Sequence, residues 1–292
     1  MNLRDLEYFV AVAELGHFGK AAERCFCTQP TLSGQLKKLE EELGSPLLER
    51  LPGGGIRLTE FGEVALVHAH EALVASRRIA DLGKASRDPY QGDLVLAAIP
   101  TIGPWLWPKA IPALHGEYPN LSVFLREEQT AVLLRSLRDG SVDLGILALP
   151  VDGNGLEAAA LWDEPFLLAV PEGHELSGRG SMPVRELSNL DLLLLEDGHC
   201  LRDQALEVCR AAGAREREGF RATSLESLRQ MVLSGIGLTL LPAGAANPES
   251  GIGLVAFDQP PTRTVGIVWR KGHPRSRAIE GLARVLRTAR PF

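Results

Sequence analysis

The most constraining feature of the sequence is a tight break between short helices close to the N-terminus. The spacing of apolar residues predicts helices over 3–16 and 20–26. A third helix is expected to start near Thr28 and Pro30, because threonine is a good N-cap and proline is tolerated in a first turn. Gly44 is expected to end it. Four leucines share one face of this helix: Leu32, Leu36, Leu39 and Leu43. This arrangement predicts a helix-turn-helix.

If those leucines are buried, the outer face of the third helix carries polar residues suited to close approach to a DNA duplex. The candidates on or beside it are Gln29, Pro30, Thr31, Ser33, Gln35, Lys37 and Lys38. Lysines can neutralise phosphates, and hydroxyls can reach the backbone or base edges. The segment 47–58 predicts two short strands around a glycine-rich turn, a wing that would bring Arg50 and Arg57 to the DNA backbone. An isolated helix of this kind would more simply be amphipathic with a solvated face; its neighbours favour DNA binding.

Net charge and hydropathy do not decide whether the chain binds DNA, but they argue against a membrane protein and against a secreted one. The chain has 31 basic and 37 acidic residues, a net charge of −6, so only the distribution on one helix can argue for DNA. No apolar run reaches the ~18 residues that a membrane span needs. The N-terminus is acidic where a signal peptide is basic and then apolar. We therefore expect a cytoplasmic protein with no membrane partner.

Beyond the wing, the pattern predicts a long helix and then an α/β region. The helix covers about 60–86 and is typical of a dimerising linker, and the Pro- and Gly-containing segment 88–92 separates it from the α/β region. Strands are expected at about 93–99, 121–126, 142–149, 166–170, 191–195, 237–241 and 264–270. Helices are expected near 104–117, 129–139, 200–212, 224–234 and 276–289. This alternation predicts a mostly parallel sheet. It also suggests two lobes, with the chain crossing to the second lobe near residue 162 and returning near residue 265.

Cys200 and Cys209 form the chemically most informative pair. Cys200 is expected at a helix N-terminus, where the helix dipole favours a thiolate, with His199 and Arg202 close in sequence. Nine residues of continuous helix would separate the two cysteines by about 13 Å, whereas a disulfide needs Cα atoms within about 7 Å. A bridge would therefore require this helix to unwind, as a redox switch does. The simpler interpretation of the spacing alone is two buried packing cysteines.

The N-terminal motifs resemble the winged helix-turn-helix of LysR-type transcriptional regulators. The matching residues are Phe18-Gly19-x-Ala21-Ala22, Gln29-Pro30-Thr31-Leu32-Ser33, Leu43-Gly44 and Leu47-Leu48-x-Arg50. This resemblance implies a two-lobed α/β effector domain like the periplasmic binding proteins, and dimers that often assemble into tetramers. It implies a DNA-binding domain over 1–59, a linker helix over 60–87 and a regulatory domain over 92–292. Lobe I would comprise about 92–162 and 266–292, and lobe II about 163–265.

The C-terminal motifs are similar to the peroxide-sensing group within that family. The match includes Gly198-His199-Cys200-Leu201-Arg202 and Phe220-Arg221-Ala222-Thr223-Ser224. It implies that Cys200 reacts with hydrogen peroxide and that Cys209 resolves it as a disulfide. The peroxide pocket would comprise Thr101, Thr130, His199, Arg202 and Arg270. Implied partners are operator DNA, RNA polymerase, further copies of the chain and a cellular dithiol reductant. One departure is Gly219, where this group commonly has histidine.

Two other functions are compatible with parts of the sequence. A LysR-type regulator could respond to a small metabolite in the interlobe cleft, and a Cys–His pair alone would permit an enzyme such as a thiol peroxidase. The helix-turn-helix has no purpose in an enzyme, so we expect none. Cys25 and Cys27 lack the further ligands of a zinc or iron–sulfur site, so we expect no metal and no cofactor.

Overall fold

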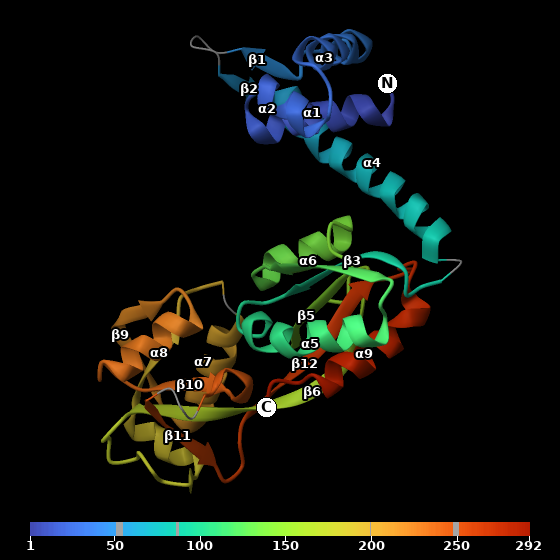
Figure 1. Cartoon of the computed structure of the whole chain (residues 1–292). Helices are drawn as coiled ribbons and strands as arrows, with labels where there is room; N and C mark the ends of the chain where they lie inside the picture. Colours follow the sequence, from blue (N-terminus) through green and yellow to red (C-terminus); the bar gives the residue numbers. More distant parts are fainter. Residues whose placement is uncertain (51–54, 86–87, 199, 248–250) are drawn as a thin grey trace. The chain divides into compact units, whose positions relative to one another are not determined.

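The computed structural model describes residues 1–50, 55–85, 88–198, 200–247 and 251–292. The chain forms two compact units, Met1–Gly83 and Lys84–Phe292, which Figure 1 colours from blue to red along the sequence. Among the described residues, no helix is both long and apolar enough to cross a membrane.

The first unit contains three short helices, a hairpin and a long helix. Its elements are α1 (Leu3–Leu15), α2 (Phe18–Arg24), α3 (Gln29–Leu43), β1 (Leu48–Arg50), β2 (Ile56–Leu58) and α4 (Glu60–Ala85). The start and end of α3 are as predicted: the Thr28 side chain accepts a hydrogen bond from the Thr31 N–H, and Gly44 has φ +71°. The helix α2 begins two residues earlier than predicted, because His17 caps it through Nδ1. The strands β1 and β2 pair antiparallel.

The leucine stripe of α3 packs into the core of this unit, together with α1 and α2. Leu32, Leu36 and Leu39 are at most 2 % exposed, as expected, whereas Leu43 is 37 % exposed because the helix ends there. Phe9 of α1 and Ala21 of α2 are buried in the same cluster. The apolar residues therefore fix α3 by one face and leave the other face to solvent.

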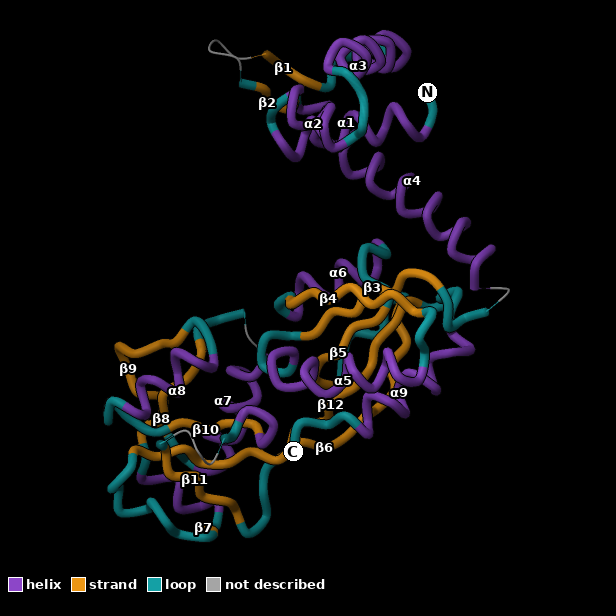
Figure 2. Tube along the Cα trace, in the orientation of Figure 1, coloured by secondary structure: helices purple, strands orange, loops and turns teal. Residues whose placement is uncertain are grey.

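The second unit is built around an eight-stranded sheet (Figure 2). Its strands are β3 (Gly92–Ala98), β4 (Leu121–Glu127), β5 (Leu144–Leu149), β6 (Leu156–Pro171), β7 (Ser181–Met182), β10 (Thr239–Pro242), β11 (Ile252–Phe257) and β12 (Thr262–Arg270). The order is β4-β3-β5-β12-β6-β11-β7, and β10 also pairs with β6. Because β12 runs antiparallel to both β5 and β6, the sheet is mixed, which corrects the expectation of a mostly parallel one.

Helices cover this sheet, and a second, smaller sheet lies beside it. The helices are α5 (Gly103–Glu117), α6 (Thr130–Asp139), α7 (Cys200–Ala212), α8 (Leu225–Leu233) and α9 (Ile279–Thr288), with short 3₁₀ turns η1 (Val184–Asn189), η2 (Ala243–Ala245) and η4 (Ser276–Ala278). The smaller sheet pairs β8 (Asp191–Leu195) with β9 (Arg215–Ala222) in parallel. An isolated bridge joins Leu192 to Leu238.

The long strand β6 links two separate hydrophobic cores. Leu161 and Trp162 belong to the first core, with α5, α6 and α9, whereas Phe166 belongs to the second, with α7 and α8. The chain returns to the first core between Phe257 and Val265. Each core defines one lobe, so this unit is a two-lobed α/β domain.

Four strands differ from the sequence-based expectation. The strand β6 begins at Leu156 rather than near 166, and β7, β9 and β11 were not predicted. The first half of β6 is rich in alanine, and β9 begins Arg-Glu-Arg-Glu, so neither segment has the apolar alternation that signals a strand.

Candidate functional site

The candidate site centres on α7, which begins at Cys200 as predicted and continues unbroken to Ala212. Gly198 precedes it with φ +98°. Cys200 is half-buried, and Cys209 is 2 % exposed within the second core. Both thiols are free. Because the cysteines are nine positions apart on a continuous helix, their Cα atoms are about 13 Å apart along the helix axis, which is too far for a disulfide.

Cys200 lines a cavity of about 460 Å³ between elements of the two lobes. Thr130, the first residue of α6, and Gln204 of α7 share this cavity with it. Arg263 of β12 and Phe166 of β6 also line it. The structure thus brings Thr130 to Cys200, as the sequence predicted, and adds an arginine that the sequence did not single out.

Two buried residues, Glu164 and Thr101, hold Arg263. Its Nε donates to Glu164 Oε2 at 2.7 Å, Nη1 donates to Thr101 Oγ1 at 2.9 Å, and Nη2 donates to the Thr101 carbonyl at 3.0 Å. Both side chains of the Arg263–Glu164 ion pair are at most 3 % exposed. The second Glu164 oxygen accepts from the Gly244 N–H at 2.8 Å. Thr101 therefore orients the arginine, and it is not one of the described residues that line the cavity.

Arg270, the arginine expected at this pocket, lies elsewhere. Its Nη1 donates to the Leu137 carbonyl in the last turn of α6 at 2.9 Å. Thr130 begins the same helix, so Arg270 and Thr130 sit at opposite ends, roughly 10 Å apart along the axis. Arg263 lies near the start of β12, just before the apolar run of that strand, and no sequence motif marked it. The one sequence signal that could have indicated Arg263 was its position on the strand, now β12, along which the chain returns from one lobe to the other.

Arg202 also differs from expectation, because it points away from the cavity. Residues two positions apart on a helix are separated by about 200° of rotation, so Arg202 lies on the opposite side of α7 from Cys200. There it donates to Glu216 Oε1 and Oε2 at 2.8 and 3.0 Å, to Asp197 Oδ1 at 2.9 Å and to the Leu195 carbonyl at 2.9 Å.

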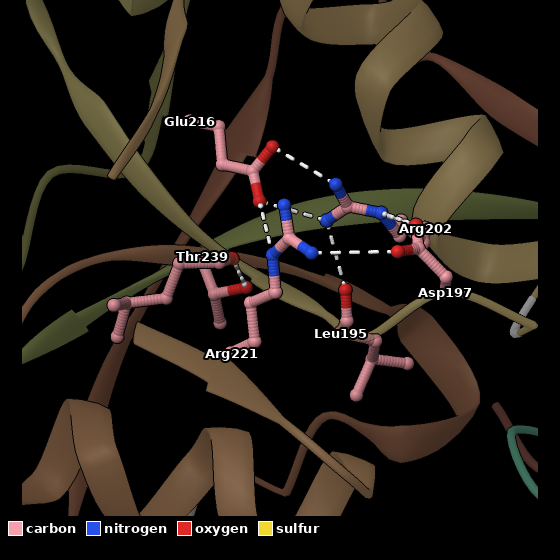
Figure 3. Close-up of polar contacts among 7 residues, drawn as sticks. Leu195, Asp197, Arg202, Glu216, Arg221 and Thr239 are labelled. Carbon is pink, nitrogen blue, oxygen red and sulfur yellow. Dashed lines mark hydrogen bonds and ion pairs between the residues drawn. The ribbon is translucent and has the colours of Figure 1, made fainter. Parts of the chain in front are cut away.

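Arg221 extends this cluster, which we call the Arg202 network (Figure 3). It donates to Glu216 and to Asp197, each at 3.3 Å. The hydrogen bond from Arg202 holds the pKa of Glu216 below its ordinary value, and the bond with Glu216 raises the pKa of Arg202. The network ties the first turn of α7 to β8, to β9 and to the loop before the helix.

Cys209 is held as a neutral thiol. Burial, followed by the negative charge of Glu216, raises the pKa of Cys209 to about 11. Since the thiolate is the reactive form of cysteine, Cys209 is unreactive at neutral pH while α7 is intact.

Two of the predicted site residues lie outside what the structure describes. His199 is one of them, and the side chain of Arg50 is the other, although the Arg50 backbone belongs to β1. Gly219 has φ +82°, the left-handed region that favours glycine, so a histidine in this backbone conformation would be strained.

The predicted DNA-binding residues lie on the part of α3 that the core leaves free. Gln29, Pro30, Thr31, Lys37 and Lys38 are exposed, and Ser33 and Gln35 are half-buried. Lys37 lies 3.7 Å from Glu41 in the same helix, and Arg57 of the hairpin donates to Glu49 at 2.9 Å. The face therefore offers hydroxyls, amides and two lysines to an anionic partner.

Comparison with known proteins gives matches over nearly the whole chain. Residues 3–63 match the family described as bacterial regulatory helix-turn-helix protein, lysR family, and residues 87–291 match the LysR substrate binding domain. The DNA-binding transcriptional dual regulator OxyR of Escherichia coli K12 is 45 % identical over 98 % of this chain and 95 % of its own length.

Two structures that cover nearly the whole chain are similar as well. Full-length OxyR from Pseudomonas aeruginosa, with one cysteine replaced by aspartate, has a TM-score of 0.75 and 39 % identity, covering 98 % of this chain and 95 % of that one. A hydrogen peroxide-bound cysteine-to-serine mutant of Corynebacterium glutamicum OxyR has a TM-score of 0.67 and 34 % identity, covering 99 % and 92 %.

Proposed function

Because this chain belongs to the LysR family of bacterial helix-turn-helix regulators, we propose that it is a transcription regulator that hydrogen peroxide switches through a reversible Cys200–Cys209 disulfide. The observation that carries the proposal is the position of Cys200, which begins α7 and lines a cavity with Thr130 and Arg263. The similar E. coli protein is a DNA-binding transcriptional regulator, and the similar C. glutamicum structure contains hydrogen peroxide. These relatives favour peroxide over a small metabolite as the signal.

In the first step, Cys200 attacks hydrogen peroxide as its thiolate. A sulfur–oxygen bond forms and the oxygen–oxygen bond breaks, so the sulfur is oxidised to a sulfenic acid and the distal oxygen leaves as hydroxide, which takes a proton to become water. Arg263 is suited to stabilise that departing negative charge, because Glu164 and Thr101 hold its guanidinium in place beside the cavity. Thr130 contributes a hydroxyl to the same cavity.

In the second step, the Cys209 sulfur attacks the Cys200 sulfenic acid and releases water, leaving a disulfide. The separation of about 13 Å along α7 means that the helix must unwind first. Unwinding also exposes Cys209 and removes the burial that raises its pKa to about 11. A covalent signal at Cys200 is thereby converted into a change of structure over the segment that the Arg202 network holds.

The output of this switch is a change in DNA binding by the first unit. We assign the DNA contacts to Gln29, Pro30, Thr31, Ser33, Gln35, Lys37 and Lys38 of α3, with Arg50 and Arg57 on the hairpin. The face has the composition that binds phosphates and base edges. The division into a DNA-binding domain at 1–59, a linker helix at 60–87 and a regulatory domain at 92–292 follows the family pattern.

The remaining partners belong to the same proposal. RNA polymerase, a dimer or tetramer of this chain and a cellular dithiol that reduces the disulfide are what a regulator of this kind requires. The site of action is the cytoplasm, where a reducing environment returns the disulfide to thiols. The matched family is one of regulators, and we propose no catalytic turnover.

Peptide mapping by mass spectrometry tests the proposal directly. The reduced full-length protein is treated briefly with stoichiometric hydrogen peroxide, quenched with an alkylating reagent and digested. We expect a Cys200–Cys209 disulfide that is absent from the untreated protein, while Cys25 and Cys27 remain alkylated and serve as internal controls.

The Cys200→Ser variant provides the second arm. It should form no disulfide and should leave peroxide-dependent transcription from a bound promoter at its basal level. Intact thiols at both positions in the wild type, or an unchanged peroxide response in Cys200→Ser, would refute the proposed switch.

A further inference from the structure

Gln204 is a cavity residue to which the motifs gave no role. It lies four residues after Cys200 on α7, and residues at that spacing share one face of a helix. It lines the same cavity as Cys200, Thr130 and Arg263. Its Oε1 atom is buried, and it has no hydrogen-bond partner among the described residues.

The size of the cavity does not select hydrogen peroxide. Its volume of about 460 Å³ lies within the ~300–1,000 Å³ that is typical of pockets for molecules much larger than hydrogen peroxide. A hydroperoxide with several carbon atoms would fit in that space, and the lining includes apolar side chains such as Leu134 and Val208. Selection by shape is therefore weak, so any selection has to come from hydrogen bonds.

Hydrogen peroxide and an alkyl hydroperoxide differ at the oxygen that leaves. A thiolate attacks the terminal hydroxyl oxygen of either molecule, forming the sulfur–oxygen bond and breaking the oxygen–oxygen bond. The leaving group is hydroxide from hydrogen peroxide and an alkoxide from an alkyl hydroperoxide. Only hydrogen peroxide carries an O–H donor on its distal oxygen, where the alkyl hydroperoxide carries carbon.

We propose that Gln204 is a specificity-determining residue, whose amide oxygen accepts a hydrogen bond from the distal O–H of hydrogen peroxide. A buried acceptor satisfied by the correct substrate is left unpaired by an analogue without the donor, and this discriminates between them. The two groups have distinct tasks: Arg263 stabilises the charge that develops on the leaving oxygen, while Gln204 recognises its proton. This inference rests on the proposed function, because it assumes that Cys200 is the atom attacked.

The test compares two oxidants on the full-length reduced protein. Rate constants for loss of the Cys200 thiol are measured with hydrogen peroxide and with tert-butyl hydroperoxide, in wild type and in Gln204→Leu. We expect the variant to react about fivefold more slowly with hydrogen peroxide, corresponding to ~1 kcal/mol for one neutral hydrogen bond. Its rate with tert-butyl hydroperoxide should be unchanged or faster, so the ratio of the two rate constants falls.

Two further variants make the result interpretable. Gln204→Met keeps the length of the side chain without the acceptor and should behave as Gln204→Leu does, which guards against a folding defect in one of them. Gln230→Leu makes the same substitution on α8, outside the cavity lining, and should leave both rate constants unchanged.

Each outcome bears on a different claim. Equal slowing with both oxidants, or no slowing with either, would overturn the role of Gln204 while leaving the redox switch intact. Failure of the wild type to lose its Cys200 thiol with hydrogen peroxide would overturn the proposed function itself.

Discussion

Replacing Glu216 by glutamine should loosen the reduced form of α7 and speed its conversion to the disulfide. Glu216 accepts two hydrogen bonds from Arg202, whose side chain is 7 % exposed, at 2.8 and 3.0 Å. Hydrogen bonds to charged groups contribute ~1.5–3 kcal/mol each. Glutamine keeps one acceptor oxygen but loses the charge and turns an N–H toward the guanidinium.

The expected loss of stability in α7 is smaller than that for a buried charge left without any partner. Such a charge costs ~3–5 kcal/mol, but Arg202 retains Asp197 and the Leu195 carbonyl, each at 2.9 Å. We therefore expect the free energy of opening α7 to fall by ~2 kcal/mol, which is about a 30-fold increase in the open population. Losing the Glu216 charge also removes one cause of the raised Cys209 pKa, and this acts in the same direction.

Amide hydrogen exchange over residues 200–212 of the reduced protein measures the opening, and quenched mass spectrometry measures disulfide formation after a peroxide pulse. Both should be faster in Glu216→Gln by up to about 30-fold. The matched control is Glu226→Gln, which removes a two-bond pair with Arg229 from a side chain that is 54 % exposed, and a surface pair contributes little. Exchange and disulfide rates in Glu216→Gln that match those of this control would refute the idea that the Arg202 network restrains α7.

Three other predictions concern pH, thiol reactivity and salt. Because the pKa of Glu216 is held below its ordinary value, the stability it gives α7 is present above that ordinary value and is lost as pH falls through the lowered pKa. Protection of the amides of residues 200–212, taken relative to the intrinsic exchange rate at each pH, should therefore fall on acidification more in wild type than in Glu216→Gln. In the reduced protein, iodoacetamide should leave Cys209 unmodified near neutral pH and modify it increasingly as pH approaches about 11. Lys38→Gln should lower the slope of log affinity for operator DNA against log salt by about 1, and Lys271→Gln should not change it.

The parts of the fold that could be predicted are those that neighbouring residues determine. Thr28 and Gly44 cap α3 through their own side chain and backbone, and the start of α7 at Cys200 follows a glycine with a positive φ. By contrast, the hydrophilic strand β9 forms because β8 and the network pair with it, and those partners are distant in sequence.

The candidate site divides in the same way. Sequence adjacency suggested Arg202 as a pocket residue, although the rotation of a helix places it on the far side from Cys200 and places Gln204 on the near side. Arg263 reaches Thr101 across 162 positions of the chain. No local pattern contains that contact, so the choice between Arg263 and Arg270 needed the three-dimensional arrangement.

The separation of the β8–β9 pair from the eight-stranded sheet has a consequence for reversibility. The backbone of β8 joins the main sheet at the Leu192–Leu238 bridge, where the Leu193 N–H donates to the Leu238 carbonyl and the Thr239 hydroxyl donates to the Leu193 carbonyl. The helix α7 contacts the rest of its lobe through side-chain packing in the second core, so α7 with β8 and β9 can open and re-form as a cooperative unit while the hydrogen-bonded main sheet stays intact. After reduction, α7 refolds and packs against a sheet that has stayed intact. Each cycle of signalling therefore requires only local refolding.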